Sequence, residues 1–185
     1  MGNEKDKMIS GFMYNPQDEE LVKDRETAKS LCFQYNQTRP ENKIARYNII
    51  NKLISNCGKD FVIEQSFQCD YGYNIEFGDN FYSNHNLVIL DSAKVKFGNN
   101  IFIGPNCGFY TPEHPLNGIE RAKGMEYAQP ITVGNDVWFG GGVNVLSGVN
   151  IGDNVVIGAG SVVTKDIPSN SVAVGNPCRV IKSIY

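Results

Sequence analysis

The chain of 185 residues contains two histidines, His85 and His114, whose side chains can change charge near neutral pH without help from their surroundings. His114 lies between Glu113 and Pro115 in a polar segment, where an imidazole can act as a general base toward a substrate hydroxyl. A surface imidazole without a chemical role is the alternative. His85 lies in the segment SNHNLV, where a role in chemistry is less expected, although Asn84 beside it can donate and accept hydrogen bonds.

The sequence lacks the residue patterns of several other common sites: disulfide pairs, metal ligands, phosphate-binding loops and the serine hydrolase motif. The five cysteines, at 32, 57, 69, 107 and 178, are odd in number and form no C-x-x-C pair, which indicates free thiols in a reducing cytoplasm. Two histidines cannot supply the three imidazole ligands of a β-helical carbonic anhydrase, so we expect no metal. The chain has no Walker loop, no G-x-G-x-x-G and no G-x-S-x-G.

Charge and hydropathy exclude further classes. The 17 basic and 20 acidic residues give a net charge of −3, which argues against a nucleic-acid binder. No apolar run approaches the roughly 20 residues of a membrane span, and the N-terminus has no secretory signal. We therefore expect a cytoplasmic protein that contacts neither nucleic acid nor membrane.

A repeat of six residues predicts the scaffold that positions these side chains. From Val133 the sequence is VGNDVW, FGGGVN, VLSGVN, IGDNVV, IGAGSV and VTKDIP, with an aliphatic or aromatic residue at the first position and Val, Ser or Ile at the fifth. Such units form short strands that stack as triangular coils around an apolar shaft, each coil stable only beside its neighbours. This frame predicts a mainly β protein, a left-handed parallel β-helix over residues 60–185.

The same frame occurs earlier, from Phe77 and again from Phe97. These residues are 20 apart, three sixes plus two, so we expect a small insertion near Val95–Lys96.

Residues 1–59 have a different pattern and predict an N-terminal α-helical cap. Asn15-Pro16-Gln17-Asp18 resembles a helix start with Asn15 as the cap, and a second helical stretch ends at Cys57–Gly58. The cap either packs on the β-helix or serves as a lid over a substrate site.

Two segments break the repeat. Residues 111–130, which include His114, lack aliphatic residues at the six-residue spacing of the repeat. We therefore expect them to leave the shaft as one extruded loop, where catalytic groups are often held. Residues 169–185 end the β-helix with a basic C-terminal tail, after the break at Asn176-Pro177.

These segments together resemble the maltose/galactoside O-acetyltransferase family. The strings that carry the resemblance are EKDKMISGFMY, CDYGYNIEFGDNFYSN, EHP, PITVGNDVWFGGG and IGAGSVVTKDIPSNSVAVGNPCRVIK. The resemblance implies direct transfer of acetyl from acetyl-coenzyme A (acetyl-CoA) to a hydroxyl of a sugar such as maltose, glucose or a galactoside.

The resemblance also implies roles for individual residues. His114 would be the general base, and a backbone amide near Gly140–Gly141 would bind the oxyanion. The implied acceptor-binding residues are Asp70, Tyr82, Asn84, Asp91 and Glu126, the last with a further role in orienting His114.

For acetyl-CoA, the resemblance implies a groove between subunits of a homotrimer, lined by Trp138, Gly141, Ala159, Thr164, Lys165, Arg179 and Lys182. Two other readings stay open. A xenobiotic (antibiotic) acetyltransferase of the same fold would lack the helical cap, and a catalytically silent β-helix scaffold would lack the histidine base.

Overall fold

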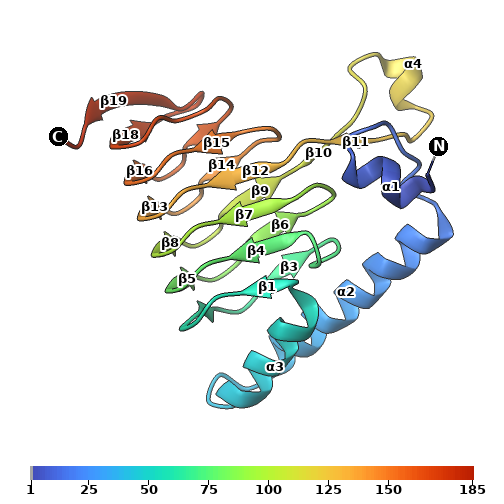
Figure 1. The fold of residues 1–185 in the computed structure, drawn as a ribbon, viewed down its shortest axis with the longest axis horizontal. Helices are drawn as coiled ribbons and strands as arrows, with labels where there is room; N and C mark the ends of the chain where they lie inside the picture. The colour runs from blue at the N-terminus through green and yellow to red at the C-terminus, as the bar shows by residue number, and fades with distance from the viewer. Residues whose placement is uncertain (1) are drawn as a thin grey trace.

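The computed structural model describes residues 2–185, which form an N-terminal group of helices followed by a stack of short strands (Figure 1). The helices are α1 (Glu4–Ile9), α2 (Glu19–Gln37) and α3 (Lys43–Leu53), and a short α4 (Gly118–Arg121) lies in an excursion from the stack. The first strand is at Asn56–Cys57, so strands begin three residues after α3 ends.

The strands form three sheets that are the faces of a triangular shaft. Sheet 1 contains β1 (Asn56–Cys57), β4 (Ile75–Phe77), β7 (Val95–Phe97), β12 (Ile131–Val133) and β15 (Asn150–Ile151). Sheet 2 contains β2 (Val62–Ile63), β5 (Phe81–Ser83), β8 (Ile101–Ile103), β13 (Val137–Phe139), β16 (Val155–Ile157), β18 (Ser171–Val174) and β19 (Arg179–Ser183). Sheet 3 contains β3 (Gln68–Cys69), β6 (Val88–Leu90), β9 (Gly108–Tyr110), β14 (Asn144–Val145) and β17 (Val162–Val163).

The chain visits sheets 1, 2 and 3 in turn, and stacked strands pair in parallel, for example Phe77 with Phe97 and Val133 with Ile151. The prediction of a left-handed parallel β-helix of hexapeptide repeats is confirmed. We name its edges after the sheets they join: the 1–2 corner, the 2–3 corner and the 3–1 corner.

The shaft is filled by the residues that the repeat predicts. Between 133 and 167, every first and fifth position of the frame is buried. Below them a column of phenylalanines continues the shaft, with ring centroids 4.5–5.3 Å apart through Phe77, Phe81, Phe97, Phe109 and Phe139. Continuous apolar packing between coils holds the stack together, since each coil buries its inward face against the next.

The 1–2 corner repeats one turn in every coil. Asn80, Asn100 and Asp136 have φ of 57°, 57° and 58°, the left-handed region that Asn and Asp tolerate better than most residues. Their side chains are joined along the corner, because Asn80 Nδ2 donates to Asn100 Oδ1 and Asn100 Nδ2 donates to Asp136 Oδ1, both at 2.8 Å. Gly98 lies beside them, where a Cβ would stand 2.6 Å from the carbonyl oxygen of Gly134 in the next coil.

The helical cap covers the first coil and satisfies its backbone groups. Asn36 of α2 accepts from the N–H of Phe67 at 2.9 Å and donates to its carbonyl at 2.8 Å, and Arg46 of α3 donates to the carbonyl of Ile63 at 2.7 Å. Tyr35 donates to the same carbonyl. These groups would otherwise lie unpaired at the end of the stack.

The predicted helix start at Asn15 is wrong by three residues. Asp18 caps α2, accepting from the N–H of Glu20 at 3.1 Å, whereas Asn15 accepts from Gln17 in a turn that precedes the helix. The second cap helix ends at Leu53, before the predicted Cys57–Gly58.

The C-terminal segment is more regular than predicted. Ser171–Val174 forms β18, which pairs in parallel with β16, and the basic tail folds back as β19 in antiparallel pairing with β18. The tail therefore closes one edge of sheet 2.

Candidate active site

The 3–1 corner differs from the other two because it holds the extra residues of the coils. Phe77 pairs with Phe97 twenty residues later, and the surplus lies at 91–94, where Asp91, Ser92 and Ala93 are all buried. The expected insertion at Val95–Lys96 is therefore a few residues off, since those residues are within β7. The same corner of the coil below is made by residues 70–74, and the excursion leaves from this corner one coil above.

The excursion is a hairpin, in agreement with the predicted loop at 111–130. It starts at Thr111, whose hydroxyl donates to Leu90 O at 2.7 Å and accepts from Ala93 N at 2.9 Å. Strands β10 (Pro112–Glu113) and β11 (Tyr127–Ala128) then pair antiparallel, with α4 at the tip, and the hairpin lies beside α1 (Figure 1). It is thus anchored at its base both to the shaft and to the cap.

His114 follows β10 directly and its side chain is 51% exposed. Its Nδ1 lies 3.3 Å from the carbonyl oxygen of Met125 across the hairpin. A carbonyl only accepts, so this contact places the proton on Nδ1 and leaves the Nε2 lone pair to receive one. Glu126 Oε1 lies 3.8 Å from that Nε2.

Glu126 is held by the cap. Its Oε2 accepts from the hydroxyl of Tyr14 at 2.6 Å, and the backbones of the two residues exchange hydrogen bonds of 2.9 and 3.1 Å. Tyr14 has no exposed surface, and burial together with the Glu126 carboxylate raises its pKa, so the phenol stays protonated and donates. No pattern in the sequence indicated Tyr14, which is 112 residues from its partner.

Two aspartates lie at the same corner with different surroundings. Asp91 is fully buried, and its carboxylate accepts from the N–H groups of Asp70, Tyr71 and Asn74 at 3.0, 2.8 and 3.3 Å. Burial raises the pKa of Asp91 to about 7, against the opposing effect of these donors. Asp70 is partly exposed, and burial raises its pKa while Arg25 lowers it. Asp91 therefore holds the backbone of residues 70–74 from the interior of the protein, whereas the side chain of Asp70 is partly exposed to solvent.

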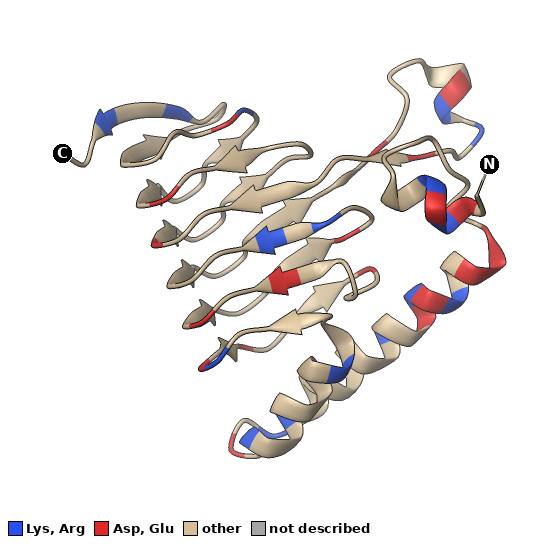
Figure 2. Cartoon of the chain, in the orientation of Figure 1, with Lys and Arg blue, Asp and Glu red and all other residues tan. Residues whose placement is uncertain are grey.

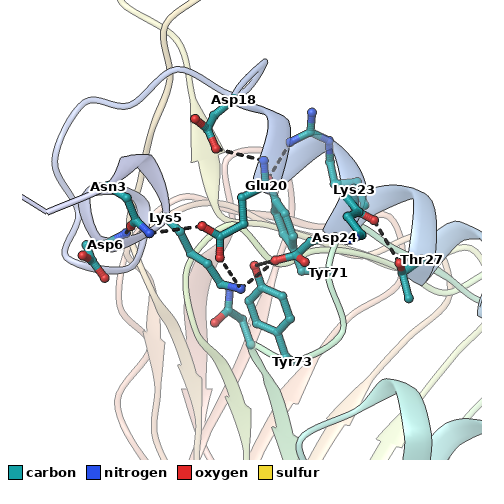
Figure 3. A network of polar contacts seen from close by, with 12 residues as sticks. Asn3, Lys5, Asp6, Asp18, Glu20, Lys23, Asp24, Thr27, Tyr71 and Tyr73 are labelled. Carbon is teal, nitrogen blue, oxygen red and sulfur yellow. Dashed lines mark hydrogen bonds and ion pairs between the residues drawn. The ribbon is translucent and has the colours of Figure 1, made fainter.

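A network of polar contacts fixes the cap to this corner (Figure 3). Lys5 of α1 pairs with Asp24 of α2 at 2.7 Å, and Tyr73 donates to the same carboxylate at 3.1 Å. Arg25 donates to the hydroxyl of Tyr71 at 2.6 Å. The cap thus forms one wall beside His114 and Asp70.

The remaining predicted residues lie elsewhere. Asn84, Gly141 and Ala159 are at the 2–3 corner, and Tyr82 and Trp138 lie on the outer face of sheet 2, with Trp138 57% exposed. A Cβ on Gly141 would have Pro105 as its nearest neighbour, at 3.4 Å, whereas a Cβ on Gly140 would stand 2.6 Å from the backbone nitrogen of Ala159, so Gly141 is the less crowded of the two. His85 is exposed at the same corner, with Nδ1 2.8 Å from Gln65 O.

The predicted cationic residues are divided between two places. Thr164 and Lys165 follow β17 at the 3–1 corner, on the same side of the shaft as His114, whereas Arg179 and Lys182 lie on β19 at the edge of sheet 2. Figure 2 shows that the cap and α4 also carry many of the charges, while most of the strand residues are uncharged. One protomer therefore places His114 beside Glu126, with Asp70 close enough for the Glu126 charge to affect its pKa, whereas Asn84, Gly141 and Ala159 lie at a different corner of the shaft.

Residues 2–185 contain neither a cluster of metal ligands nor a membrane-spanning helix. No group of three or more His, Cys, Asp or Glu side chains in this range could hold a metal ion. In the same range, no helix is both long and apolar enough to cross a membrane.

Comparison with known proteins places this arrangement in a family. Residues 7–58 match the model of the maltose acetyltransferase hexapeptide capping motif, and residues 130–165 match that of the bacterial transferase hexapeptide repeat. A maltose O-acetyltransferase from Clostridium difficile 630 is 49% identical, with a TM-score of 0.97 over 100% of this chain and 98% of that one.

Two further similar structures contain coenzyme A or acetyl-CoA. A galactoside acetyltransferase in complex with coenzyme A is 39% identical, with a TM-score of 0.96 over 100% of this chain and 92% of that one. A hexapeptide-repeat acetyltransferase from Vibrio cholerae, complexed with acetyl-CoA, is 32% identical, with a TM-score of 0.92 over the full length of both chains. The chain therefore belongs to the maltose/galactoside O-acetyltransferase family of hexapeptide-repeat acetyltransferases.

Proposed function

We propose that the protein transfers the acetyl group of acetyl-CoA directly to a hydroxyl of a sugar, with His114 as general base. The observation that carries the proposal is the contact of His114 Nδ1 with Met125 O, which leaves Nε2 ready to accept a proton on a half-exposed side chain beside the cap-bound Glu126. Maltose, glucose and galactosides are the acceptors that we would offer first, because the similar proteins are named for maltose and galactoside.

The reaction needs one base and one oxyanion site. The acceptor oxygen bonds to the thioester carbonyl carbon while its proton passes to His114 Nε2, and the carbonyl becomes a tetrahedral oxyanion. A backbone amide at Gly140–Gly141 stabilises that oxyanion. Collapse breaks the C–S bond, and the leaving thiolate takes the proton from the imidazolium, which yields the acetyl ester and coenzyme A and restores the base.

The active site is completed by a neighbouring subunit in a homotrimer. The 3–1 corner of one protomer, with His114, Thr164 and Lys165, would face the 2–3 corner of the next, with Asn84, Gly141 and Ala159. An exposed apolar column on sheet 2 supports this assembly: Val62, Phe102 and Trp138 are 49%, 54% and 57% exposed on one register line that crosses four coils, with the partly buried Tyr82 between Val62 and Phe102. Such a column in a single chain marks a contact surface.

The donor would lie along the groove between those corners. Gly141 and Ala159 let the pantetheine arm approach the backbone, Trp138 lines the groove, and Lys165, Arg179 and Lys182 meet the phosphates. On the acceptor side, Asp70, Tyr82, Asn84 and Glu126 would bind sugar hydroxyls, with Asp91 acting through the backbone of residues 70–74 that it holds.

The experiment is an acceptor panel. Protein and acetyl-CoA are mixed with maltose, glucose, galactosides, simple alcohols and aminoglycoside or other antibiotic acceptors, and release of free thiol is followed. Turnover with sugars supports the proposal. Turnover with antibiotics alone would favour the xenobiotic acetyltransferase, and silence with every acceptor would favour the inert scaffold.

A further inference from the structure

The hairpin that carries His114 is joined to the cap by a chain of three side chains that runs from the core to the surface. Tyr14 is fully buried, Glu126 is 21% exposed and His114 is 51% exposed at the side chain. The Tyr14 hydroxyl is 2.6 Å from Glu126 Oε2, and Glu126 Oε1 is 3.8 Å from His114 Nε2. The buried member of this row of side chains, Tyr14, belongs to the cap, and the exposed member, His114, is the proposed base.

The two distances suit different tasks. An O–H···O⁻ bond of 2.6 Å is a strong, charge-assisted bond, and it fixes the carboxylate. A separation of 3.8 Å is too long for a hydrogen bond, so the Glu126 carboxylate, which can only accept, does not hold a proton on Nε2, the atom that must receive one from the acceptor. It is short enough, in a partly buried setting, for the carboxylate to stabilise the positive charge that His114 gains.

We propose that Tyr14 is a positioning residue of the reaction: it holds Glu126 where its carboxylate stabilises the imidazolium of His114 without blocking Nε2. This inference rests on the proposed function. It assigns to the N-terminal cap a part in the chemical step, in addition to covering the first coil.

The protein contains a matched control for the Tyr14 hydroxyl, namely Tyr73. Tyr73 also donates its hydroxyl to a carboxylate across the contact between cap and shaft, to Asp24 at 3.1 Å, and within residues 2–185 it makes no hydrogen bond to Glu126 or His114. Tyr73→Phe therefore removes a similar docking bond and reports what weaker attachment of the cap does by itself.

The test is a steady-state comparison of Tyr14→Phe, Glu126→Gln, the double variant and Tyr73→Phe, with thermal unfolding as a check of folding. Tyr14→Phe keeps the buried ring, so we expect a folded protein whose kcat falls about tenfold while KM for acetyl-CoA stays unchanged. Glu126→Gln should lose at least as much. Because Tyr14 acts only through Glu126, the double variant should lose no more than Glu126→Gln alone.

Three results separate failure of this inference from failure of the proposed function. Full kcat in Tyr14→Phe, a multiplicative loss in the double variant, or an equal loss in Tyr73→Phe would overturn the role of Tyr14. The His114→Ala variant, assayed beside them, tests the base itself: if it is inactive while Tyr14→Phe is normal, only the inference about Tyr14 fails.

Discussion

The 1–2 corner and the 3–1 corner are made by the same coils, but they are built differently. At the 1–2 corner, Asn80, Asn100 and Asp136 repeat one left-handed turn and bond to one another on the surface. At the 3–1 corner, the coils carry extra residues, a carboxylate is buried, and a hairpin leaves the shaft. A uniform corner copies one set of hydrogen bonds from coil to coil, whereas a corner with added residues can hold side chains in positions that no other coil repeats.

The largest expected difference between the corners is in turnover. His114→Ala should lower kcat by about 100-fold or more, because general-base steps contribute about 10²–10⁴. His85→Ala removes the other imidazole, at the 2–3 corner, and should leave the rate close to that of the wild type. Thiol release under saturating acetyl-CoA measures both variants, and a normal rate in His114→Ala would remove this residue from the mechanism.

A second prediction tests whether two corners from different protomers form one site. Gly141→Trp should block the groove at the 2–3 corner, so it and His114→Ala are each inactive alone. In trimers assembled at random from both variants, roughly a quarter of the sites would combine an intact His114 corner with an intact Gly141 corner. Activity should return to about that share upon co-expression, whereas a site within one chain would stay inactive.

A third prediction compares carboxylates at the two corners. Asp91→Asn replaces a carboxyl oxygen, which can accept a hydrogen bond, with an amide nitrogen, which cannot, beside backbone N–H donors. In mild acid, we therefore expect a loss of about 1–3 kcal/mol in the free energy of unfolding. Asp79 at the 1–2 corner accepts from Lys59 N at 2.7 Å but is exposed, and Asp79→Asn keeps an acceptor oxygen. Its effect should stay within about 0.5 kcal/mol in urea unfolding.

The same aspartate gives a pH dependence. Burial raises the pKa of Asp91 to about 7 in the folded protein, above the value of about 3.9 in an unfolded chain. The unfolded chain loses this proton at about pH 4, whereas the folded protein keeps it up to about pH 7. The free energy of unfolding of the wild type therefore falls as the pH rises from about 4 to 7. The stability difference between the wild type and Asp91→Asn should be largest in mild acid and should shrink toward pH 8; a constant difference would contradict it.

Apart from the control variants, the smallest effect is expected from one turn of the 1–2 corner. Asn100→Ala keeps a β-carbon in the left-handed region but lacks the polar side chain that lets Asn tolerate it, and it removes two side-chain hydrogen bonds, at a cost of about 1 kcal/mol or somewhat more. Asn100→Gly removes the same bonds without the backbone strain. Equal losses in the two variants would show that the ladder of side chains, rather than the backbone, sets the cost.

The sequence predicted the shaft well because one inward position recurs in coil after coil, as at Val133, Val145 and Ile157. It misplaced the insertion because Val95 and Phe97 both face inward and fit the frame themselves. It could not show that Asp91 is buried, since its partners are backbone groups of the coil below.

The sequence also failed to predict the exact start of α2 and the contact between the cap and the hairpin. Asn15-Pro16 precedes Asp18, and both Asn and Asp can cap a helix, so the true start of α2 depends on tertiary contacts such as that between Arg25 and Tyr71. The contact of Tyr14 with Glu126 leaves no periodic trace, because it joins two irregular segments that the fold alone brings together.

The covering of both ends of the shaft has a consequence for assembly. At the first coil, Asn36, Tyr35 and Arg46 occupy backbone groups that another copy's strands would need, and at the far end β19 runs against the direction of every coil below it. The parallel coil of a second copy therefore cannot continue sheet 2 in the same register beyond β19, and this hinders growth of the stack by end-to-end addition.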